Sequence, residues 1–475
     1  MDELLAQARA AAERGEVDAA IALCTEAHGR RPERLEPITL ALQILDRTDT
    51  GDRLVAWAEL GLARAPGEVF YQAAMAYGRD LRGEWDVAAP YWRRAATLRG
   101  EPSAFAFQLG RSLMYAGDLG GAATVLERAL GAGAPDPLKS DPERMLGEAK
   151  LKGADITGFK LYQARDVSDG GAFALPHIPT WRGEDLAGRT LLVSHHLGYG
   201  DQLMLAPLVA QLAERAARLV ITCDVAVREV LAHSLPQARF GGMGRAALPN
   251  TPASPELTAL VADVHPAFHA SLLGACAPLT IDEVTRASTA RLSAPPEAAA
   301  RARLRLGNIR RRYPGRGLIG LAFDAVQHRE PSMNPVVRAH AFRRSVPLAL
   351  VAPLTEALAE HCHFVILHPD AHRARIGATP PNSSVLEGDL ADFSQTAGVI
   401  QALDGVVAVD SSVANLAAKL GGPSWILLAW SADWRWGQGG ARTPWFPTAT
   451  LFRQPVPGDW ASVMRVLAEA LRLPR

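Results

Sequence analysis

Small and apolar residues recur every 34 positions over the first 136 residues of the chain. Three such series run through this segment, and each has a member in four successive stretches. The members are Ala8, Leu42, Ala76 and Gly110; Ala20, Leu54, Ala88 and Ala122; and Ala27, Gly61, Ala95 and Ala129. In each stretch a Gly followed by Glu or Asp supplies a turn and a helix cap. The pattern therefore predicts four pairs of antiparallel helices, which touch where their side chains are small.

The helix pairs resemble the tetratricopeptide repeat, whose units stack into a solenoid. The resemblance implies an all-α arm over residues 1–150 that ends in a capping helix, followed by a linker over 151–181. The Gly- and Pro-rich stretch SDGGAFALPHIPTW supports the linker. Stacked repeats present a concave surface, so the arm is expected to bind a protein or peptide. A structural cap or a dimerisation arm is the alternative.

Beyond residue 180, short apolar runs alternate with amphipathic helical patterns. Strands are expected at 189–194, 218–224, 317–323, 364–369, 384–389, 405–410 and 425–430. Strands that alternate with helices form parallel sheets covered on both faces. The Ala- and Arg-rich segment 295–312 separates two such series. The pattern predicts two Rossmann-like domains, 182–310 and 311–475, with ligands bound at the carboxyl ends of the strands.

One corner between a predicted strand and a predicted helix has residues that suit an anion-binding site. The run GVVAVD ends at Asp410, and Ser411 or Ser412 can cap the helix SVANLAAKLG that follows. The N-terminus of a helix offers free backbone N–H groups and the positive end of its dipole, so it suits an anion. The small side chains at 411, 412 and 414 leave room for a diphosphate.

Several segments along the second half resemble motifs of inverting glycosyltransferases with two Rossmann domains, the GT-B fold. They are WRGEDLAGRTLLV (181–193), GYGD (198–201), RSVPL (344–348), DFSQTAGVIQALDGVVAVDSSVA (392–414), DWRW (433–436) and PWFPTATLFRQ (444–454). The resemblance is to the ADP-heptose heptosyltransferase family and its tetratricopeptide-fused bacterial relatives, and more distantly to O-linked N-acetylglucosamine transferases. It implies an N-terminal all-α tetratricopeptide solenoid followed by an α/β GT-B pair of Rossmann-like domains.

The resemblance also implies roles for individual residues. Asp201 is expected to be the general base that takes the proton of the acceptor hydroxyl, with a helix cap as the alternative. Arg344 is expected to neutralise the departing diphosphate, with a solvated surface arginine as the alternative. Trp434 either stacks on the donor or belongs to the core. The expected donor-binding residues are Arg344, Asp410, Ser411, Ser412, Asn415, Trp434 and Arg435, and those on the acceptor side are His196, Gly198 and Gly200.

Members of the family usually have His where this chain has Asn415, and Asn cannot carry a proton or a positive charge. The segment DAVQHREPSMNPVVRAHAFR before RSVPL is also longer than in the relatives.

The resemblance implies a metal-independent transferase that moves a sugar from a nucleotide-diphosphate sugar to a protein presented by the repeats. The alternatives are a heptosyltransferase-like enzyme acting on lipopolysaccharide or another glycan, and an inactive scaffold.

Composition and charge bear on the partners, the location and the cofactors of the protein. Lys and Arg together number 50, as do Asp and Glu, so no nucleic-acid partner is expected. The N-terminus shows no secretory signal, no run is long enough to span a membrane, and the four cysteines lie far apart. We therefore expect a cytoplasmic protein. A strand should scatter the histidines of HCHFVILHPDAHR, and Asp-x-Asp, phosphate-loop and dinucleotide motifs do not occur. We expect no metal and no cofactor, while the sugar, the nucleotide and the oligomeric state stay open.

Overall fold

The computed structural model describes residues 1–46, 51–101, 104–132, 140–164, 173–244, 251–325, 339 and 343–472. Contacts divide the chain into two compact units. The first unit is Met1–Met145 with Gln327–Arg343, and the second is Leu146–Val326 with Arg344–Arg475. Helix α9, Ser140–Lys152, passes through the boundary between the two units as one helix.

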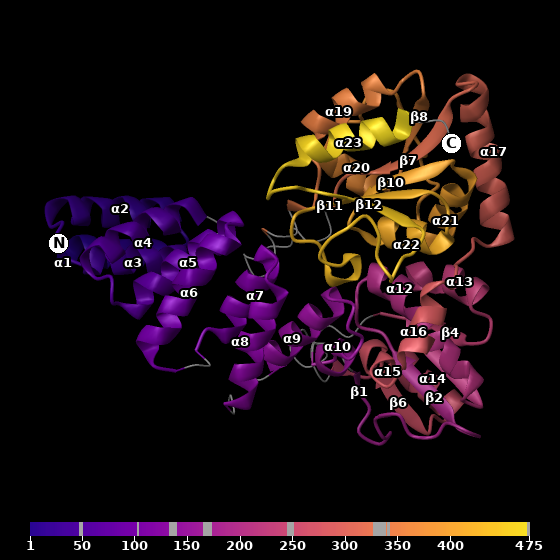
Figure 1. Ribbon diagram of the computed structural model, residues 1–475, viewed down its shortest axis with the longest axis horizontal. Coiled ribbons are helices and arrows are strands. Elements are labelled where there is room, and N and C mark those ends of the chain that lie inside the picture. The colour runs from indigo at the N-terminus through magenta and orange to yellow at the C-terminus, as the bar shows by residue number, and fades with distance from the viewer. Residues whose placement is uncertain are drawn as a thin grey trace. The chain divides into compact units, whose positions relative to one another are not determined.

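Four helix pairs build the first unit, drawn in indigo and purple in Figure 1. They are α1 (Asp2–Glu13) with α2 (Val17–Arg30), α3 (Glu36–Leu45) with α4 (Gly51–Arg64), α5 (Val69–Arg82) with α6 (Trp85–Arg99), and α7 (Ala106–Ala116) with α8 (Leu119–Gly131). Every member of the three 34-residue series is buried. A Cβ on Gly61 would lie 2.5 Å from the Tyr71 ring, and one on Gly110 would lie 2.8 Å from Leu126. The predicted helix pairs are confirmed, and residues 47–50 of one predicted turn lie outside the described residues.

A buried carboxylate ties three helices of this arm together. Asp80 on α5 is 0% exposed and accepts hydrogen bonds from Trp92 Nε1 (3.0 Å) on α6 and from Arg111 Nη2 (3.0 Å) and Ser112 Oγ (2.7 Å) on α7. A buried charge is stable in a core only when its lone pairs are satisfied, as these are. The network therefore fixes α6 and α7 against α5.

Replacing Asp80 with Ala should destabilise the arm by roughly 3–5 kcal/mol, because it leaves the Arg111 guanidinium buried without its carboxylate. Urea unfolding followed by circular dichroism measures the change. The matched control is Asp18→Ala, which removes the carboxylate of the exposed Asp18–Arg53 ion pair. That change should alter stability little, since exposed ion pairs contribute little. Equal effects of the two substitutions would contradict the assignment.

Two all-parallel sheets form the second unit. The first has the order β4 (Arg239–Gly242), β3 (Arg218–Cys223), β2 (Thr190–Ser194), β6 (Phe268–Ser271). The second has the order β12 (Ala449–Arg453), β11 (Ser424–Leu428), β10 (Gly405–Val409), β7 (Gly317–Ala322), β8 (Cys362–Ile366), β9 (Ser383–Val385). The chain order reverses between β2 and β6 and again between β7 and β10. In parallel sheets, ligands bind at the carboxyl ends of the strands beside such a reversal.

Helices cover both sheets, and β1 (Phe173–Ala174) and β5 (Thr251–Pro252) form a separate two-stranded sheet. The helices are α10 (Gly158–Tyr162), α12 (Tyr199–Ala210), η1 (Gln211–Glu214), α13 (Val225–Ser234), α14 (Pro255–Val264), α15 (Leu272–Cys276), α16 (Ile281–Ser288), α17 (Pro296–Arg312), α19 (Leu348–Ala357), α20 (Asp370–Ile376), α21 (Phe393–Ala402), α22 (Ser412–Leu420), η3 (Trp434–Trp436) and α23 (Trp460–Arg472). One continuous apolar core contains side chains of both sheets. A second core lies beneath α19 and α23, on the other face of the larger sheet (Figure 1).

The segment predicted as a linker contains packed structure. Helix α10 lies within 151–181, and its Phe159 and Tyr162 belong to the core of the second unit. Residues 165–172 of that segment lie outside the described residues, as do residues 326–338 and 340–342 of the long segment before RSVPL. The predicted boundary at 310 falls in the last turn of α17, which Arg301 and Arg305 tie to Asp389 at 3.0 and 2.6 Å.

None of the described helices is long and apolar enough to cross a membrane. The cysteines Cys24, Cys223, Cys276 and Cys362 are all free and buried.

Candidate active site

The first corner of the candidate site follows β10. This strand is buried along its whole length, and Asp410 at its carboxyl end is 4% exposed. Ser411 is the N-cap of α22, and its side chain accepts from the backbone N–H of Ala414 at 3.4 Å. Asp410 accepts a hydrogen bond from Trp436 Nε1 at 2.7 Å and pairs with Arg344 Nη1 at 3.4 Å. The N-terminus of α22 therefore lies beside a fixed carboxylate and a guanidinium.

The second corner follows β2 and leads into α12. Gly198 is the N-cap of this helix, with an extended backbone, and Asp201 is the third helical residue. The interpretation of Asp201 as a helix cap is therefore wrong, because the helix begins three residues earlier than a cap at that position requires. Gln202 fixes the corner: its Nε2 donates to the Leu197 carbonyl at 2.7 Å, and its Oε1 accepts from the backbone N–H of Asp224 at 2.9 Å.

The two corners meet. A Cβ on Gly200 would lie 2.3 Å from Nδ2 of Asn415 and 3.5 Å from the Cα of Ser412, so only glycine allows α12 to approach α22 this closely. Asn415 is 3% exposed, and its Oδ1 has no hydrogen-bond partner within the part of the chain that the structure describes. The start of α22, with Asn415, therefore lies against the start of α12, which carries Asp201.

Arg435 connects the two corners. Its Nη2 donates to Asp201 Oδ1 at 2.5 Å, and its Nε donates to Asp433 Oδ1 at 2.9 Å. Burial opposes the charge of Arg435, but Asp201 and Asp433 outweigh it and raise its pKa. Burial also opposes ionisation of Asp433, but Arg435 outweighs it and lowers the pKa of Asp433 to about 2. Both groups are thus charged at neutral pH.

The pairing leaves one oxygen of Asp201 available. Oδ1 accepts from Arg435, whereas Oδ2 has no hydrogen-bond partner among the described residues. A carboxylate with one oxygen held and the other open can accept a proton from a bound hydroxyl. Arg435 Nη2 already donates to Asp201 Oδ1. Arg435 therefore orients this carboxylate, and its Nη2 does not contact a donor.

The other predicted site residues fall into two groups. Ser412 and Gly198 lie half-buried at the two helix starts, and His196 lies half-buried in the loop between β2 and α12. Trp434 is 1% exposed, and the rings of Phe159 and Trp445 pack against it edge-on at 5.9 and 5.1 Å. Trp434 is therefore a core residue, as the alternative interpretation expected. We assign it no contact with the donor.

Sequence reasoning missed several residues that hold the site. Asp433 holds Arg435, Trp436 holds Asp410, and Gln202 ties the second corner together through Leu197 and Asp224. Lys152 donates to the Ala432 carbonyl at 2.7 Å. Asp433 and Trp436 stand in the DWRW segment, beside the predicted site residues Trp434 and Arg435. Nothing local marks Lys152, because its partner lies 280 residues away in the sequence.

The predicted scatter of the histidines is wrong for two of them, because the rings of His368 and His372 lie 4.3 Å apart. His363 hydrogen-bonds to Ser384 at 2.8 Å, whereas His368 Nε2 accepts from the backbone N–H of Phe323 at 3.1 Å. Burial lowers the pKa of His368 to about 3, so its ring is neutral. Within the described residues, no cluster of three or more His, Cys, Asp or Glu side chains could hold a metal ion.

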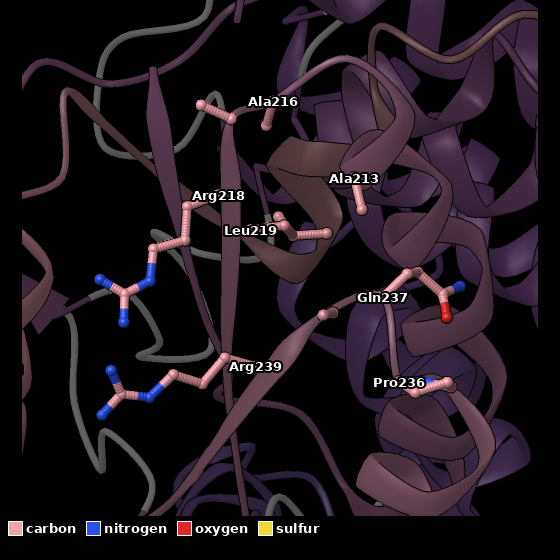
Figure 2. Close-up of a pocket in the computed structure, with 9 residues that line it drawn as sticks. Ala213, Ala216, Arg218, Leu219, Pro236, Gln237 and Arg239 are labelled. Carbon is pink, nitrogen blue, oxygen red and sulfur yellow. The ribbon is translucent and has the colours of Figure 1, made fainter. Parts of the chain in front are cut away.

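A cavity of about 290 Å³ lies elsewhere, at the amino ends of β3 and β4 (Figure 2). Arg218 and Arg239, the first residues of these strands, extend to the same side of the view. Alanines form much of the lining, and Arg239 is already paired with Asp263 at 2.5 Å. Because the carboxyl ends of the strands carry the converging polar groups, this cavity is not the candidate site.

No family model matches this chain, and no curated protein sequence does. Similar solved structures include the glycosyl transferase family 9 from Veillonella parvula DSM 2008, with 12% identity and a TM-score of 0.41 over 62% of this chain and 92% of that chain. The ADP-heptose lps heptosyltransferase II of E. coli has 13% identity and a TM-score of 0.40 over 59% and 98%. A Thermobaculum terrenum O-GlcNAc transferase mutant has 14% identity and a TM-score of 0.28 over 99% and 92%.

At these identities and TM-scores, none of the three likenesses supports a particular substrate or residue role. The fold class rests on the molecule itself, in which a solenoid of helix pairs precedes two parallel sheets with the predicted Rossmann-like order. The second unit is a pair of Rossmann-like α/β halves. The smaller sheet supplies the corner with Asp201, and the larger sheet supplies the corner with Asp410.

Proposed function

We propose that this protein is an inverting, metal-independent glycosyltransferase that moves a sugar from a nucleotide-diphosphate sugar to a protein acceptor bound by the repeats. The observation that carries the proposal is the meeting of the two corners. One contributes a carboxylate with an open oxygen, and the other contributes a helix N-terminus with a nearby guanidinium. These are the groups that a single displacement at a sugar phosphate requires.

In the proposed reaction, Asp201 Oδ2 takes the proton of the acceptor hydroxyl as its oxygen attacks the anomeric carbon. The bond from that carbon to the diphosphate breaks, and the electron pair leaves with the phosphate oxygen. The N–H groups at the start of α22 and the Arg344 guanidinium stabilise the departing charge. Arg344 exchanges its single long contact with Asp410 for the phosphate, which can accept two parallel hydrogen bonds from a guanidinium.

Asn415 suits a neutral role in this site. Its Nδ2 lies against Gly200, and its unsatisfied Oδ1 can accept a hydrogen bond from a hydroxyl group of the donor. The amide cannot move a proton, so proton transfer is left to Asp201. We place the protein in the cytoplasm, in keeping with its four free, buried cysteines.

A panel of nucleotide sugars tests the function. Thermal stabilisation by one donor, followed by release of its nucleoside diphosphate with an acceptor protein, would support the proposal. Mass spectrometry of acceptor proteins from cells with and without the gene separates a protein acceptor from a glycan acceptor. Nucleotide-sugar binding without any transfer or hydrolysis would favour the scaffold, and stabilisation by none of the donors would contradict the donor site.

Replacing Ser411 and Ser412 together with Leu should weaken nucleotide binding about tenfold to a hundredfold. The bulky side chains would displace a phosphate from the N–H groups of α22, and a hydrogen bond to a charged group contributes roughly 1.5–3 kcal/mol. Calorimetric titration measures the affinity. The matched control is Ser254→Leu, which removes a similar cap from α14, where Ser254 accepts from the Leu257 N–H at 3.2 Å. Unchanged affinity in the folded double variant would place the diphosphate elsewhere.

A further inference from the structure

A buried lysine from outside the two sheets lies behind the candidate site. Lys152 is the last residue of α9 and is 5% exposed. Its Nζ donates to the carbonyl of Ala432 at 2.7 Å, and Ala432 is itself buried. A buried ammonium is costly unless it is paired, so its position calls for a reason beyond packing.

The carbonyl that Lys152 holds begins the turn that builds the site. Asp433 and Arg435 follow within three residues, and Trp436 then donates to Asp410. On the far side of the turn, Arg453 donates to the carbonyls of Gly437 and Gly440 at 3.2 and 2.9 Å. Lys152 and Arg453 thus place two positive charges along the main chain of this turn.

The charged groups at the two corners show why an additional positive charge from Lys152 matters. Three carboxylates, Asp201, Asp410 and Asp433, face two guanidiniums, Arg344 and Arg435. A diphosphate brings more negative charge, so the corner needs further cations to accept it. A buried cation is screened much less by salt than an exposed one, and it acts over a longer range.

We propose that Lys152 is a positioning residue of the diphosphate site: its ammonium fixes the turn at 432–436 and adds the positive charge that lets the corner accept a nucleoside diphosphate. The inference rests on the proposed function and deepens it, because it assigns part of the donor site to helix α9. The lysine touches Ala432 and reaches the ligand only through this turn and through its field.

The charge of Lys152 depends on pH in an accessible range. Burial lowers its pKa to about 8, against the opposing effects of Glu148 on its own helix and of Asp433 and Asp410, while Arg453 lowers it further. Lys152 is therefore mostly charged at pH 7 and mostly neutral at pH 9.5. Because the folded pKa lies below the ordinary 10.5, its contribution to stability rises with pH between about 8 and 10.5.

Helix α22 offers a matched control. Lys419 is also buried, donates to one backbone carbonyl, that of Ser288 at 3.1 Å, and has its pKa lowered by burial to about 8. It lies near the carboxyl end of α22, whereas the site lies at the amino end. Lys419→Met therefore removes an equivalent buried charge that has no hydrogen bond to the turn at 432–436; it is linked to the turn only through the Phe446 ring, which stacks on Trp436.

The test measures the affinity of ADP, GDP and UDP by calorimetry at pH 7 and pH 9.5 for the wild-type protein and for the variants Lys152→Met, Lys152→Arg and Lys419→Met. At pH 7, Lys152→Met should bind about threefold to tenfold more weakly, the order expected for one charge in a partly buried site. At pH 9.5 its difference from the wild type should shrink, because the wild-type amine is then mostly neutral and keeps only its hydrogen bond to Ala432. Lys152→Arg, which stays charged, should bind more tightly than the wild type at pH 9.5. At a given pH the ligand has the same ionisation state for every protein, so a difference in affinity between two proteins at that pH does not come from the ligand.

Lys419→Met should follow the wild type at both pH values. Equal weakening by both Met variants, or an affinity of Lys152→Met equal to that of the wild type at pH 7, would overturn the inference while leaving the proposed function intact. If none of the three nucleotides binds the wild type, the donor site itself fails, and this inference fails with it. The melting temperature of each variant shows whether it is folded.

Discussion

Replacing Asp201 with Asn should lower kcat by about a hundredfold to ten-thousandfold, the usual effect of losing a general base. The donor Kd should change little, because the amide oxygen can still accept the hydrogen bond from Arg435 that Asp201 Oδ1 accepts. The oxygen opposite becomes an amide nitrogen, which cannot take a proton. Steady-state turnover and calorimetric donor binding, measured on the same preparation, give the two quantities.

A neighbouring substitution separates the base from the ion pair. Asp433 also pairs with Arg435, at 2.9 Å, but Asp433→Asn leaves Asp201 in place. If Asp201 acts as the base, Asp433→Asn should lower kcat much less than Asp201→Asn does. Similar losses in both variants would show that the arginine network matters rather than the base, and near-normal turnover of Asp201→Asn would refute the base role.

Deleting residues 1–136 should abolish transfer to the native acceptor protein while slow hydrolysis of the donor persists. The arm has its own apolar core, separate from that of the sheets, and the groups proposed for catalysis all belong to the second unit. Product formation with the native acceptor and nucleotide release without it are the two measurements. Equal transfer by the truncated protein would contradict recruitment by the repeats.

The truncation needs one control on the donor side. Arg343 donates to the Leu81 carbonyl and lies over the Trp85 ring at 5.7 Å, so the deletion removes its partners. Arg344, the next residue, is proposed to bind the diphosphate. The donor Kd of the truncated protein should therefore be measured beside that of the full chain. An unchanged Kd together with lost transfer assigns the effect to the acceptor.

The sequence alone determined those features that depend on neighbours along the chain. The 34-residue spacing sets the helix pairs because each small residue recurs where two helices touch, as Gly61 and Gly110 show. The alternation of apolar runs and amphipathic helices determined the two parallel sheets. Ser411 as the cap of α22 follows from local backbone chemistry.

Only the tertiary structure decided which groups share the site, because contacts between distant residues leave no local pattern. Asp201 and Arg435 are 234 positions apart, and Lys152 and Ala432 are 280 apart. The fold also decided between alternatives that the residues left open. Trp434 is a core residue because aromatic rings surround it, and Asp201 is free of a capping role because α12 begins at Tyr199. Burial and charge pairing depend on the whole fold, so the electrostatics of the corner become visible only in three dimensions.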